Sequence, residues 1–223
     1  MEDYVRLVVS DVHLGSAYCQ EDKLEKLLKT VEFDELILAG DIIEFLRHPQ
    51  FTETTARIFD YVSSLDKKVV YVVGNHDTAL NSFVSKKISN ISFTKSYTFE
   101  YADRIYRVQH GDLYDDGITR SDRWMEILSL MQNLFERYFK IDVTTWIAHW
   151  QIRKRKLKRI WDILRWNDDA DVFIMGHTHN PEVLIWVNKE EKIKTYVNCG
   201  DWVENCTYVI IKDRQVRLRK WNR

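Results

Sequence analysis

The sequence has little proline, glycine and cysteine for its length. Its 223 residues include two prolines, seven glycines and three cysteines. So little proline and glycine leaves no sign of a flexible interdomain linker, and neither an internal repeat nor a low-complexity tract is evident. The cysteines, Cys19, Cys199 and Cys206, form no CxxC pair and leave an odd count, which favours free thiols over a disulfide framework. We therefore expect one sizeable domain in a reducing compartment.

Long apolar runs are also missing. No run approaches the roughly 18 apolar residues that a membrane span requires. The opening Met1-Glu2-Asp3 leads directly into a predicted strand, without the basic and apolar regions of a signal peptide. We expect a cytoplasmic protein, or one held peripherally at the inner face of the membrane.

The net charge of −1 is close to zero, but the charges are unevenly distributed. Residues 120–166 hold eleven basic and five acidic residues, whereas the rest of the chain holds 22 basic and 29 acidic residues. Five of the eight tryptophans lie in the same segment: Trp124, Trp146, Trp150, Trp161 and Trp166. We expect this segment to face an anionic partner.

Five short polar clusters each follow an apolar run. They are Asp11-Val12-His13, Gly40-Asp41, Gly74-Asn75-His76-Asp77, His110-Gly111-Asp112 and Gly176-His177-Thr178-His179. The apolar runs, at 5–9, 36–38, 69–73, 105–108 and 172–175, are predicted as buried strands. Clusters at strand ends can converge where open α/β sheets build their sites. Together they offer carboxylate, amide and imidazole ligands for two metal ions.

The remaining pattern predicts helices on the sheet and further strands. Apolar residues follow helical spacing over 24–31 and again over 58–65. After the Asn180-Pro181 turn, the runs 182–187, 192–198, 207–211 and 215–218 are predicted as consecutive antiparallel strands. Glu44, one helical turn after Asp41, is interpreted as a first-turn helix residue and not as a ligand.

Residues 116–168 are predicted as a helical insertion with two long apolar stripes. One interpretation is a substrate lid, for which the candidate residues are Trp124, Trp146, Trp150, Arg153 and Arg155. Its apolar stripes would line a groove, while its basic residues would grip phosphate or approach anionic lipid headgroups. The alternative is a helical subdomain with a basic solvated face. Basic residues interleaved with tryptophan would also suit single-stranded nucleic acid.

In order and composition, the five clusters resemble the signature blocks DxH, GD, GNHD, HG and GHxH of the calcineurin-like metallophosphoesterase superfamily. The resemblance spans roughly residues 4–211. It implies an α/β fold, a two-sheet α/β/β/α sandwich formed by a single domain over 1–223, with the lid inserted at 116–168. It also implies a dinuclear metal centre: Asp11, His13, Asp41 and His179 for one ion, and Asp41, Asn75, His110 and His177 for the other. Manganese is the expected metal, and iron and zinc are compatible with the same ligands.

The resemblance assigns roles to residues beside the ligands. Two bound cations can lower the pKa of a shared water and clamp the phosphoryl oxygens. His76, which is not needed for coordination, could protonate or stabilise the departing oxygen, with Asp77 orienting its imidazole. Asp112, and more weakly Asp201, could accept a hydrogen bond from a ligand imidazole.

Within the superfamily, the chain is most similar to the UDP-2,3-diacylglucosamine hydrolase group. The resemblance rests on the runs Ser10-Asp11-Val12-His13-Leu14-Gly15 and Gly40-Asp41-Ile42-Ile43-Glu44-Phe45, on His110-Gly111-Asp112, and on a helical insertion before Gly176. It implies cleavage of the pyrophosphate of an acylated nucleotide sugar in lipid A biosynthesis. The chain departs from that group at His76, where many members carry Arg.

Two alternative functions remain. A phosphodiesterase or nuclease would act without an acyl chain, and its binding would weaken steeply with salt. A non-catalytic interaction module would keep the fold without the metals, although the complete ligand set and the His76-Asp77 pair argue against it. The partners expected are a phosphorylated small molecule or a glycolipid, then a membrane surface, and less so nucleic acid.

Overall fold

The computed structural model describes residues 4–46, 49–114, 163, 169–187 and 191–222. The chain divides into two units, one of residues 1–111 with 169–223 and the other of residues 112–168. In the second unit, the structure describes the 3-10 helix η2 (Asp112–Tyr114) and the buried Ile163. The candidate lid residues Trp124, Trp146, Trp150, Arg153 and Arg155 therefore lie outside the described residues, and the lid stays a prediction.

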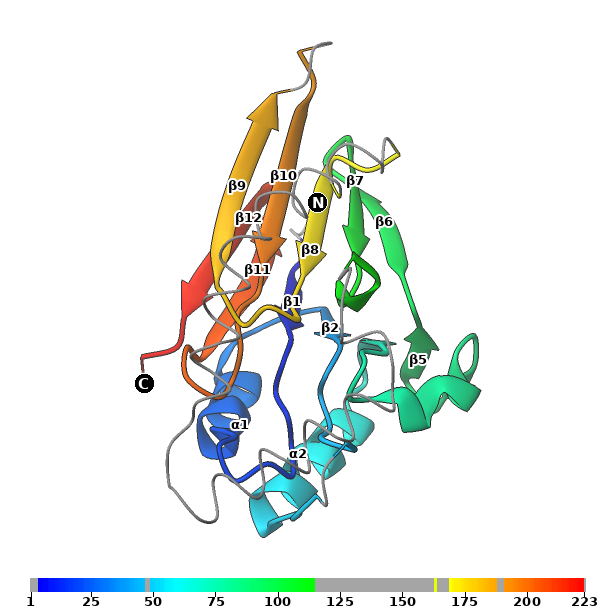
Figure 1. The fold of residues 1–223 in the computed structure, drawn as a ribbon, viewed down its shortest axis with the longest axis vertical. Helices are drawn as coiled ribbons and strands as arrows, with labels where there is room; N and C mark the ends of the chain where they lie inside the picture. The colour runs from blue at the N-terminus through cyan, green and yellow to red at the C-terminus, as the bar shows by residue number, and fades with distance from the viewer. Residues whose placement is uncertain (1–3, 47–48, 115–162, 164–168, 188–190, 223) are drawn as a thin grey trace. The chain divides into compact units, whose positions relative to one another are not determined.

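A seven-stranded sheet, here called sheet 1, has the order β12-β11-β1-β2-β3-β5-β4 (Figure 1). Its strands are β1 (Arg6–Val9), β2 (Glu35–Ala39), β3 (Lys68–Val72), β4 (Lys87–Ile88), β5 (Ile91–Thr94), β11 (Thr207–Lys212) and β12 (Gln215–Lys220). The strands β1, β2, β3 and β5 run parallel, whereas β11 joins β1 antiparallel. The carboxyl ends of these parallel strands therefore lie at one common edge of sheet 1.

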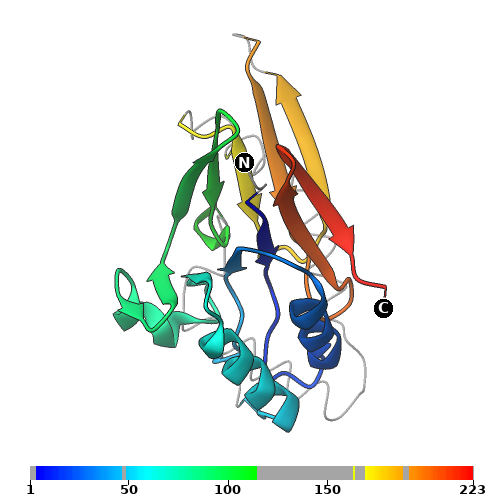
Figure 2. The ribbon, with the colours of Figure 1, turned by 180° about the vertical axis from the view of Figure 1, so that it is seen from behind.

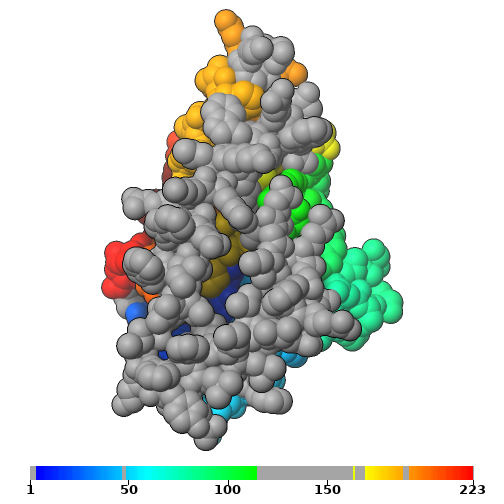
Figure 3. All heavy atoms as spheres, viewed as in Figure 1, coloured from blue at the N-terminus to red at the C-terminus, as the bar shows by residue number. Residues whose placement is uncertain are grey.

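A five-stranded sheet, sheet 2, has the order β6-β7-β8-β10-β9. Its strands are β6 (Tyr97–Tyr101), β7 (Arg104–Val108), β8 (Val172–Met175), β9 (Glu182–Val187) and β10 (Ile193–Asn198). The central strands β7, β8 and β10 are parallel, and β6 and β9 are antiparallel edges. In the space-filling view, parts of β9, β10 and the segment around the 3-10 helix η1 (Thr78–Phe83) reach the surface (Figure 3).

Two helices lie against sheet 1, as the view from behind also shows (Figure 2). The helix α1 (Glu21–Thr30) begins with acidic residues that suit a helix N-terminus, and α2 (Glu53–Ser64) begins with a capping box between Thr52 and Thr55. The hydroxyl of Tyr61 donates to the carbonyl of Leu28 at 2.9 Å and joins the two helices. Among the described residues, no helix is both long and apolar enough to cross a membrane.

The central strands of sheet 1 are buried on both faces. Leu7 and Val9 belong to a core shared with α1 and α2, whereas Val8 packs in a second core with residues of sheet 2 such as Val172 and Ile174. Strands β2 and β3 alternate between the two cores in the same way. Burial on both faces explains why these strands read as continuous apolar runs.

The five predicted motif strands and both predicted helices are confirmed, as is the two-sheet α/β fold. The expectation of four consecutive antiparallel strands at the C-terminal end is wrong in one respect. β9 and β10 form one hairpin in sheet 2, while β11 and β12 form another in sheet 1. Strand β10 pairs parallel with β8, and its Val197 belongs to the core between the sheets. Among the described residues, α1 and α2 cover sheet 1, and the second helical layer of the predicted sandwich stays a prediction.

A candidate metal centre

The five polar clusters follow β1, β2, β3, β7 and β8, and hydrogen bonds connect them. The amide of Asp11 donates to the carbonyl of Gly40 at 3.0 Å, which joins the loops after β1 and β2. The amide of Gly176 donates to the carbonyl of His110 at 3.0 Å, and the amide of His177 donates to the Asp11 carboxylate at 2.8 Å. The last bond links the ends of the two sheets. The predicted convergence at strand ends is thus observed.

The backbone is strained where these side chains leave the strands. Asp11, His13, Asp41, His177 and His179 all have positive φ, between 51° and 65°. For residues other than glycine, this left-handed conformation costs roughly 1 to 2 kcal/mol each. Five such residues in one place indicate that the fold holds the side chains in directions that a relaxed backbone would not give them.

Two glycines allow the backbone to pass close to these side chains. Gly40 has φ +90, and a Cβ there would overlap the His110 imidazole. A Cβ on Gly176 would overlap the hydroxyl of Ser10 and the carboxylate of Asp11. The glycines therefore make room for donor groups, in addition to turning the chain.

The first group of donors contains Asp11, His13 and His179, whose ligand atoms lie within 4.8 Å of one another. The Nε2 atom of His179 lies 3.3 Å from Asp11 Oδ1 and 3.3 Å from His13 Nε2. Asp11 is fully buried, and its Oδ2 also accepts a hydrogen bond from Ser10 at 2.7 Å. These three residues are the ones predicted to share an ion with Asp41.

The second group contains Asp41, His110 and His177. The Nε2 atom of His110 lies 3.0 Å from Asp41 Oδ2 and 3.0 Å from Asn75 Oδ1. The structure thus brings together all four residues that were predicted for the second ion. The bridging role of Asp41 stays a prediction, as do the ligand roles in both groups.

The chemistry and spacing of both groups fit a metal ion. Donor atoms about 2.1 Å from a metal lie roughly 3.0 to 3.4 Å apart in octahedral or tetrahedral coordination, and the four distances given above match that spacing. The far ring nitrogens are oriented by oxygen acceptors, since His110 Nδ1 faces the carbonyl of Ala39 at 3.2 Å and His13 Nδ1 faces Glu44 Oε2 at 3.1 Å. Both contacts leave the Nε2 atom directed at the donor group.

Glu44 lies against the imidazoles of His13 and His76, a position that the sequence did not predict. It lies in no helix and is 4% exposed, so the interpretation as a first-turn residue is wrong. Its carboxylate accepts from His76 Nδ1 at 2.8 Å as well as contacting His13. His13, Glu44 and His76 also form a third group of possible metal-binding residues. Because Glu44 lies against both imidazoles, we regard it as the carboxylate that orients them.

Asp77 was expected to orient His76, and the structure gives it other partners. Its carboxylate accepts from the amides of Ile42 and Ile43 and from the hydroxyl of Tyr71, the last at 2.8 Å. It also accepts from the amide of Gly74 at 3.2 Å. The hydrogen bond expected from Asp77 is therefore made by Glu44, and Asp77 instead ties the loop after β3 to the loop after β2.

The buried charges shift one another's pKa. Burial alone would raise the pKa of Asp11, but the charge of His179 and its hydrogen bond hold that pKa at about 2. Burial alone would lower the pKa of His179, yet the same pairing raises it to about 9. Likewise, Glu44 and Asp41 outweigh burial and raise the pKa of His76. The carboxylates thus favour a cation at the site.

Asp201 and Asp112, the two other candidates for accepting a hydrogen bond from a ligand imidazole, have different surroundings. The Asp201 carboxylate accepts from the amides of Val203 and Glu204 at 2.8 and 2.6 Å, so it holds the turn that follows. It also accepts from Asn205 Nδ2, which in turn donates to the carbonyl of His179 at 3.0 Å. Asp201 therefore supports the backbone of His179. Asp112 belongs to the second unit, and its predicted role beside a ligand stays a prediction.

The two-sheet fold and the clustered donors define a protein with a candidate dinuclear metal site at its strand ends. A family model described as calcineurin-like phosphoesterase matches residues 5–181. The chain belongs to this family and is a metal-dependent phosphoesterase.

Individual relatives are distant. A UDP-2,3-diacylglucosamine hydrolase from Tolumonas auensis is 22% identical over an alignment of 237 positions, gaps included, that covers 96% of this chain and 95% of the relative. Among solved structures, vacuolar protein sorting 29 from Cryptosporidium parvum is 14% identical, with a TM-score of 0.49 and coverage of 98% of this chain and 97% of that chain. The phosphoesterase YfcE from E. coli is 15% identical, with a TM-score of 0.48 and coverage of 98% and 100%.

We predict that Glu44→Gln lowers kcat on p-nitrophenyl phosphate esters by roughly 10- to 100-fold, the usual effect of losing a carboxylate behind a metal-site histidine. The amide keeps the shape but loses the charge that favours a protonated His76. Asp77→Asn is the matched comparison, and we expect it to lower the free energy of unfolding by about 1 to 3 kcal/mol because it disturbs three backbone hydrogen bonds. Unchanged kcat in Glu44→Gln would refute its orienting role.

Proposed function

We propose that this chain hydrolyses the pyrophosphate of an acylated nucleotide sugar, as a UDP-2,3-diacylglucosamine diphosphatase does. The observation that carries the proposal is the similarity to the Tolumonas auensis hydrolase along nearly the whole length of both chains. Membership of the phosphoesterase family and the two donor groups support the reaction class. The proposed substrate is taken from the relative's name, and the aromatic, basic composition of residues 120–166 supports it.

In the proposed site, one divalent cation is held by Asp11, His13, Asp41 and His179. The other is held by Asp41, Asn75, His110 and His177. When bound, two such cations neutralise phosphoryl oxygens and lower the pKa of a water molecule. Manganese is the proposed metal, and iron and zinc are compatible with the same carboxylate, amide and imidazole donors. No nucleophile from the protein is then required.

His76 is the proposed general acid. Its Nδ1–H donates to Glu44, which leaves Nε2 as the ring nitrogen that can face a substrate. The amide of His76 donates to Asp41 Oδ1 at 2.8 Å, so its backbone is fixed relative to the donor groups. A protonated Nε2 can give its proton to the departing oxygen as the P–O bond breaks.

We further propose that residues 116–168 cover the substrate and approach the inner surface of the membrane, where an acylated sugar would reside. The excess of basic residues in that segment supports attraction to anionic headgroups, and its tryptophans support contact with acyl chains. The protein would then work in the cytoplasm as a peripheral membrane enzyme. A phosphodiesterase acting on nucleotides or nucleic acid is the second candidate, favoured by the same basic and aromatic composition.

The substrate proposal predicts that the manganese-loaded protein cleaves UDP-2,3-diacylglucosamine and releases UMP, because the cut lies in the pyrophosphate. The deacylated sugar nucleotide should be a much poorer substrate, since it lacks the apolar groups. Release of UMP is measured by chromatography, with cyclic nucleotides and single-stranded DNA as comparisons. Preference for either comparison compound would replace this proposal with the second candidate.

The ligand assignment predicts different metal contents in two variants. Asp41→Ala should lose metal from both positions, because it removes a carboxylate shared by both ions. His76→Ala should keep both metals and lose most turnover, roughly 100- to 10,000-fold for a general acid. Metal is measured by elemental analysis of dialysed protein. Loss of metal in His76→Ala would make His76 a ligand, and retained turnover would remove it from catalysis.

The lid proposal predicts a selective effect of replacing Trp146 and Trp150 with Ala. Activity on acylated substrates should fall more than activity on p-nitrophenyl phosphate esters, because only the former would use an apolar lid. The quantity to compare is the ratio of the two kcat/KM values in variant and wild type. An equal loss on both would indicate a structural role for the insertion.

A further inference from the structure

Three apolar side chains of β9 are exposed at the edge of sheet 2. Val183, Ile185 and Val187, here called the β9 strip, are 43%, 70% and 56% exposed. Val183 lies opposite Val197 of β10, so the strip shares the face of sheet 2 that packs in the core between the sheets. Ile193, opposite Val187, is exposed as well. The apolar face of sheet 2 therefore continues beyond the core that buries it.

The backbone groups of the β9 strip face away from β10. The amides of Thr195 and Cys199 donate to the carbonyls of Asp171 and Met175, so the odd-numbered residues of β10 face β8. The even-numbered residues of β10 face β9, where the register pairs them with even-numbered residues. The amides and carbonyls of the strip therefore point to the outer edge of sheet 2, where β9 is the last strand (Figure 1). The described residues make no hydrogen bond with them beyond that edge.

The other three sheet edges in the described part of the chain are protected against pairing. Strand β12 carries Arg217, Arg219 and Lys220, β4 is two residues long, and β6 carries the exposed Glu100. Charge and short length are common means of blocking an edge strand. By contrast, residues 183–187 read Val-Leu-Ile-Trp-Val and hold no charge. Strand β9 is thus the edge that is suited to pair with another strand.

We propose that β9 pairs antiparallel with β9 of a second copy of this chain, about a two-fold axis at Ile185. Ile185 then lies opposite the partner's Ile185, and Val183 lies opposite the partner's Val187. Val187 likewise lies opposite the partner's Val183, which makes three pairs. Each pair exchanges two hydrogen bonds between outward-facing backbone groups, about six in total.

The β9 strip is its own complement, which is the reason to assign a second copy of the chain as its occupant. All three pairs join β-branched apolar side chains, which favour contact across antiparallel strands. No charge within residues 183–187 meets a like charge in the partner. So short a pairing buries less surface than a standard protein interface, and the dimer should therefore dissociate on dilution. Dimer formation does not depend on which phosphoester the protein cleaves.

Sedimentation of the full chain over a dilution series tests the dimer. The mass of the wild type should rise with concentration from 26.8 kDa towards twice that value. Ile185→Lys should weaken association at least about tenfold, because two like charges then lie directly opposite each other. Ile88→Lys is the matched control, since it adds the same charge to an exposed isoleucine of β4, another edge strand, and should leave association unchanged.

A charge swap tests the register without relying on the loss of a dimer. Ile185→Glu alone should also be monomeric, whereas an equal mixture of Ile185→Lys and Ile185→Glu should form a dimer, because opposite charges then meet at the axis. The melting temperature of each variant, measured well below the dimerisation range, should match that of the wild type. Ile185 is exposed, and its backbone makes no bond to β10.

A disulfide tests the position of the axis. Ile185→Cys should form a covalent dimer under mild oxidation, because residues opposite each other in antiparallel strands lie within reach of a disulfide. Val183→Cys should not, since the two copies of residue 183 would lie about 13 Å apart. The native Cys199 and Cys206 are buried and Cys19 is partly buried, and the wild type measures their background.

Four results would overturn the proposal. They are a wild type that stays monomeric at every concentration, a dimer that persists in Ile185→Lys, a mixture of the two charged variants that stays monomeric, and equal cross-linking of the two cysteine variants. Vesicles of neutral phospholipid separate a membrane contact from a dimer. A monomeric wild type that binds them through Ile185 would make the β9 strip a lipid contact and would likewise end the dimer proposal.

Discussion

The burial of several carboxylates at one edge of the fold is the constraint on which the site depends. Asp11 and Asp41 are 0% and 2% exposed, and Glu44 is 4% exposed. An ionised carboxylate in such surroundings must be compensated by hydrogen bonds and by positive charge. Backbone amides, imidazoles and the Ser10 hydroxyl supply part of this compensation. Divalent cations would supply the rest, so metal binding and local stability are two consequences of the same buried charge.

The strained backbone at the donor residues follows from the same constraint. Parallel strands deliver their ends to one edge, but their side chains would continue to alternate between the two cores. Two residues after the ends of β1, β2 and β8, a residue in the left-handed conformation (Asp11, Asp41 and His177) redirects the side chain into the space at the edge. Hydrogen bonds between loops, such as those from Asp77 to the amides of Ile42 and Ile43, then hold the redirected segments. The strained backbone lowers the stability of the fold locally. Packing in the two large apolar cores on either side of sheet 1 offsets this loss.

Motif order and apolar runs predicted the motif strands, the two helices and the residues that converge, because strands buried on both faces leave a clear sequence signal. The role of Glu44 was missed for a physical reason. Its spacing from Asp41 matches one helical turn, but the segment stays extended, and a local pattern does not encode which distant imidazole a carboxylate reaches. The apolar neighbours Ile42, Ile43 and Phe45 were the signal that this glutamate could be buried. The placement of β11 and β12 in sheet 1 was missed because hairpin signals do not specify which sheet a hairpin joins.

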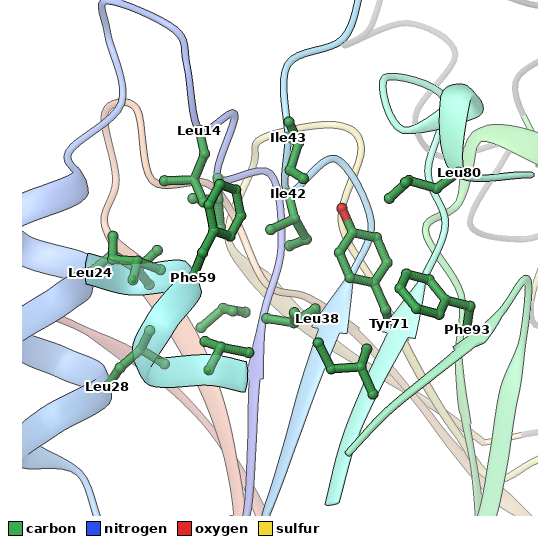
Figure 4. Close-up of a pocket in the computed structure, with 15 residues that line it drawn as sticks. Leu14, Leu24, Leu28, Leu38, Ile42, Ile43, Phe59, Tyr71, Leu80 and Phe93 are labelled. Atoms are coloured by element: carbon green, nitrogen blue, oxygen red, sulfur yellow. The ribbon is translucent and has the colours of Figure 1, made fainter. Parts of the chain in front are cut away.

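The loop after β2 connects the donor groups with an apolar cavity between α1, α2 and sheet 1 (Figure 4). Asp41 and Glu44 face the donor groups, while Ile42 and Ile43 between them line the cavity. Their amides are held by Asp77, whose other partner, Tyr71, is itself part of the cavity wall. Packing around the cavity and the position of the donor residues therefore depend on the same short segment and the same carboxylate.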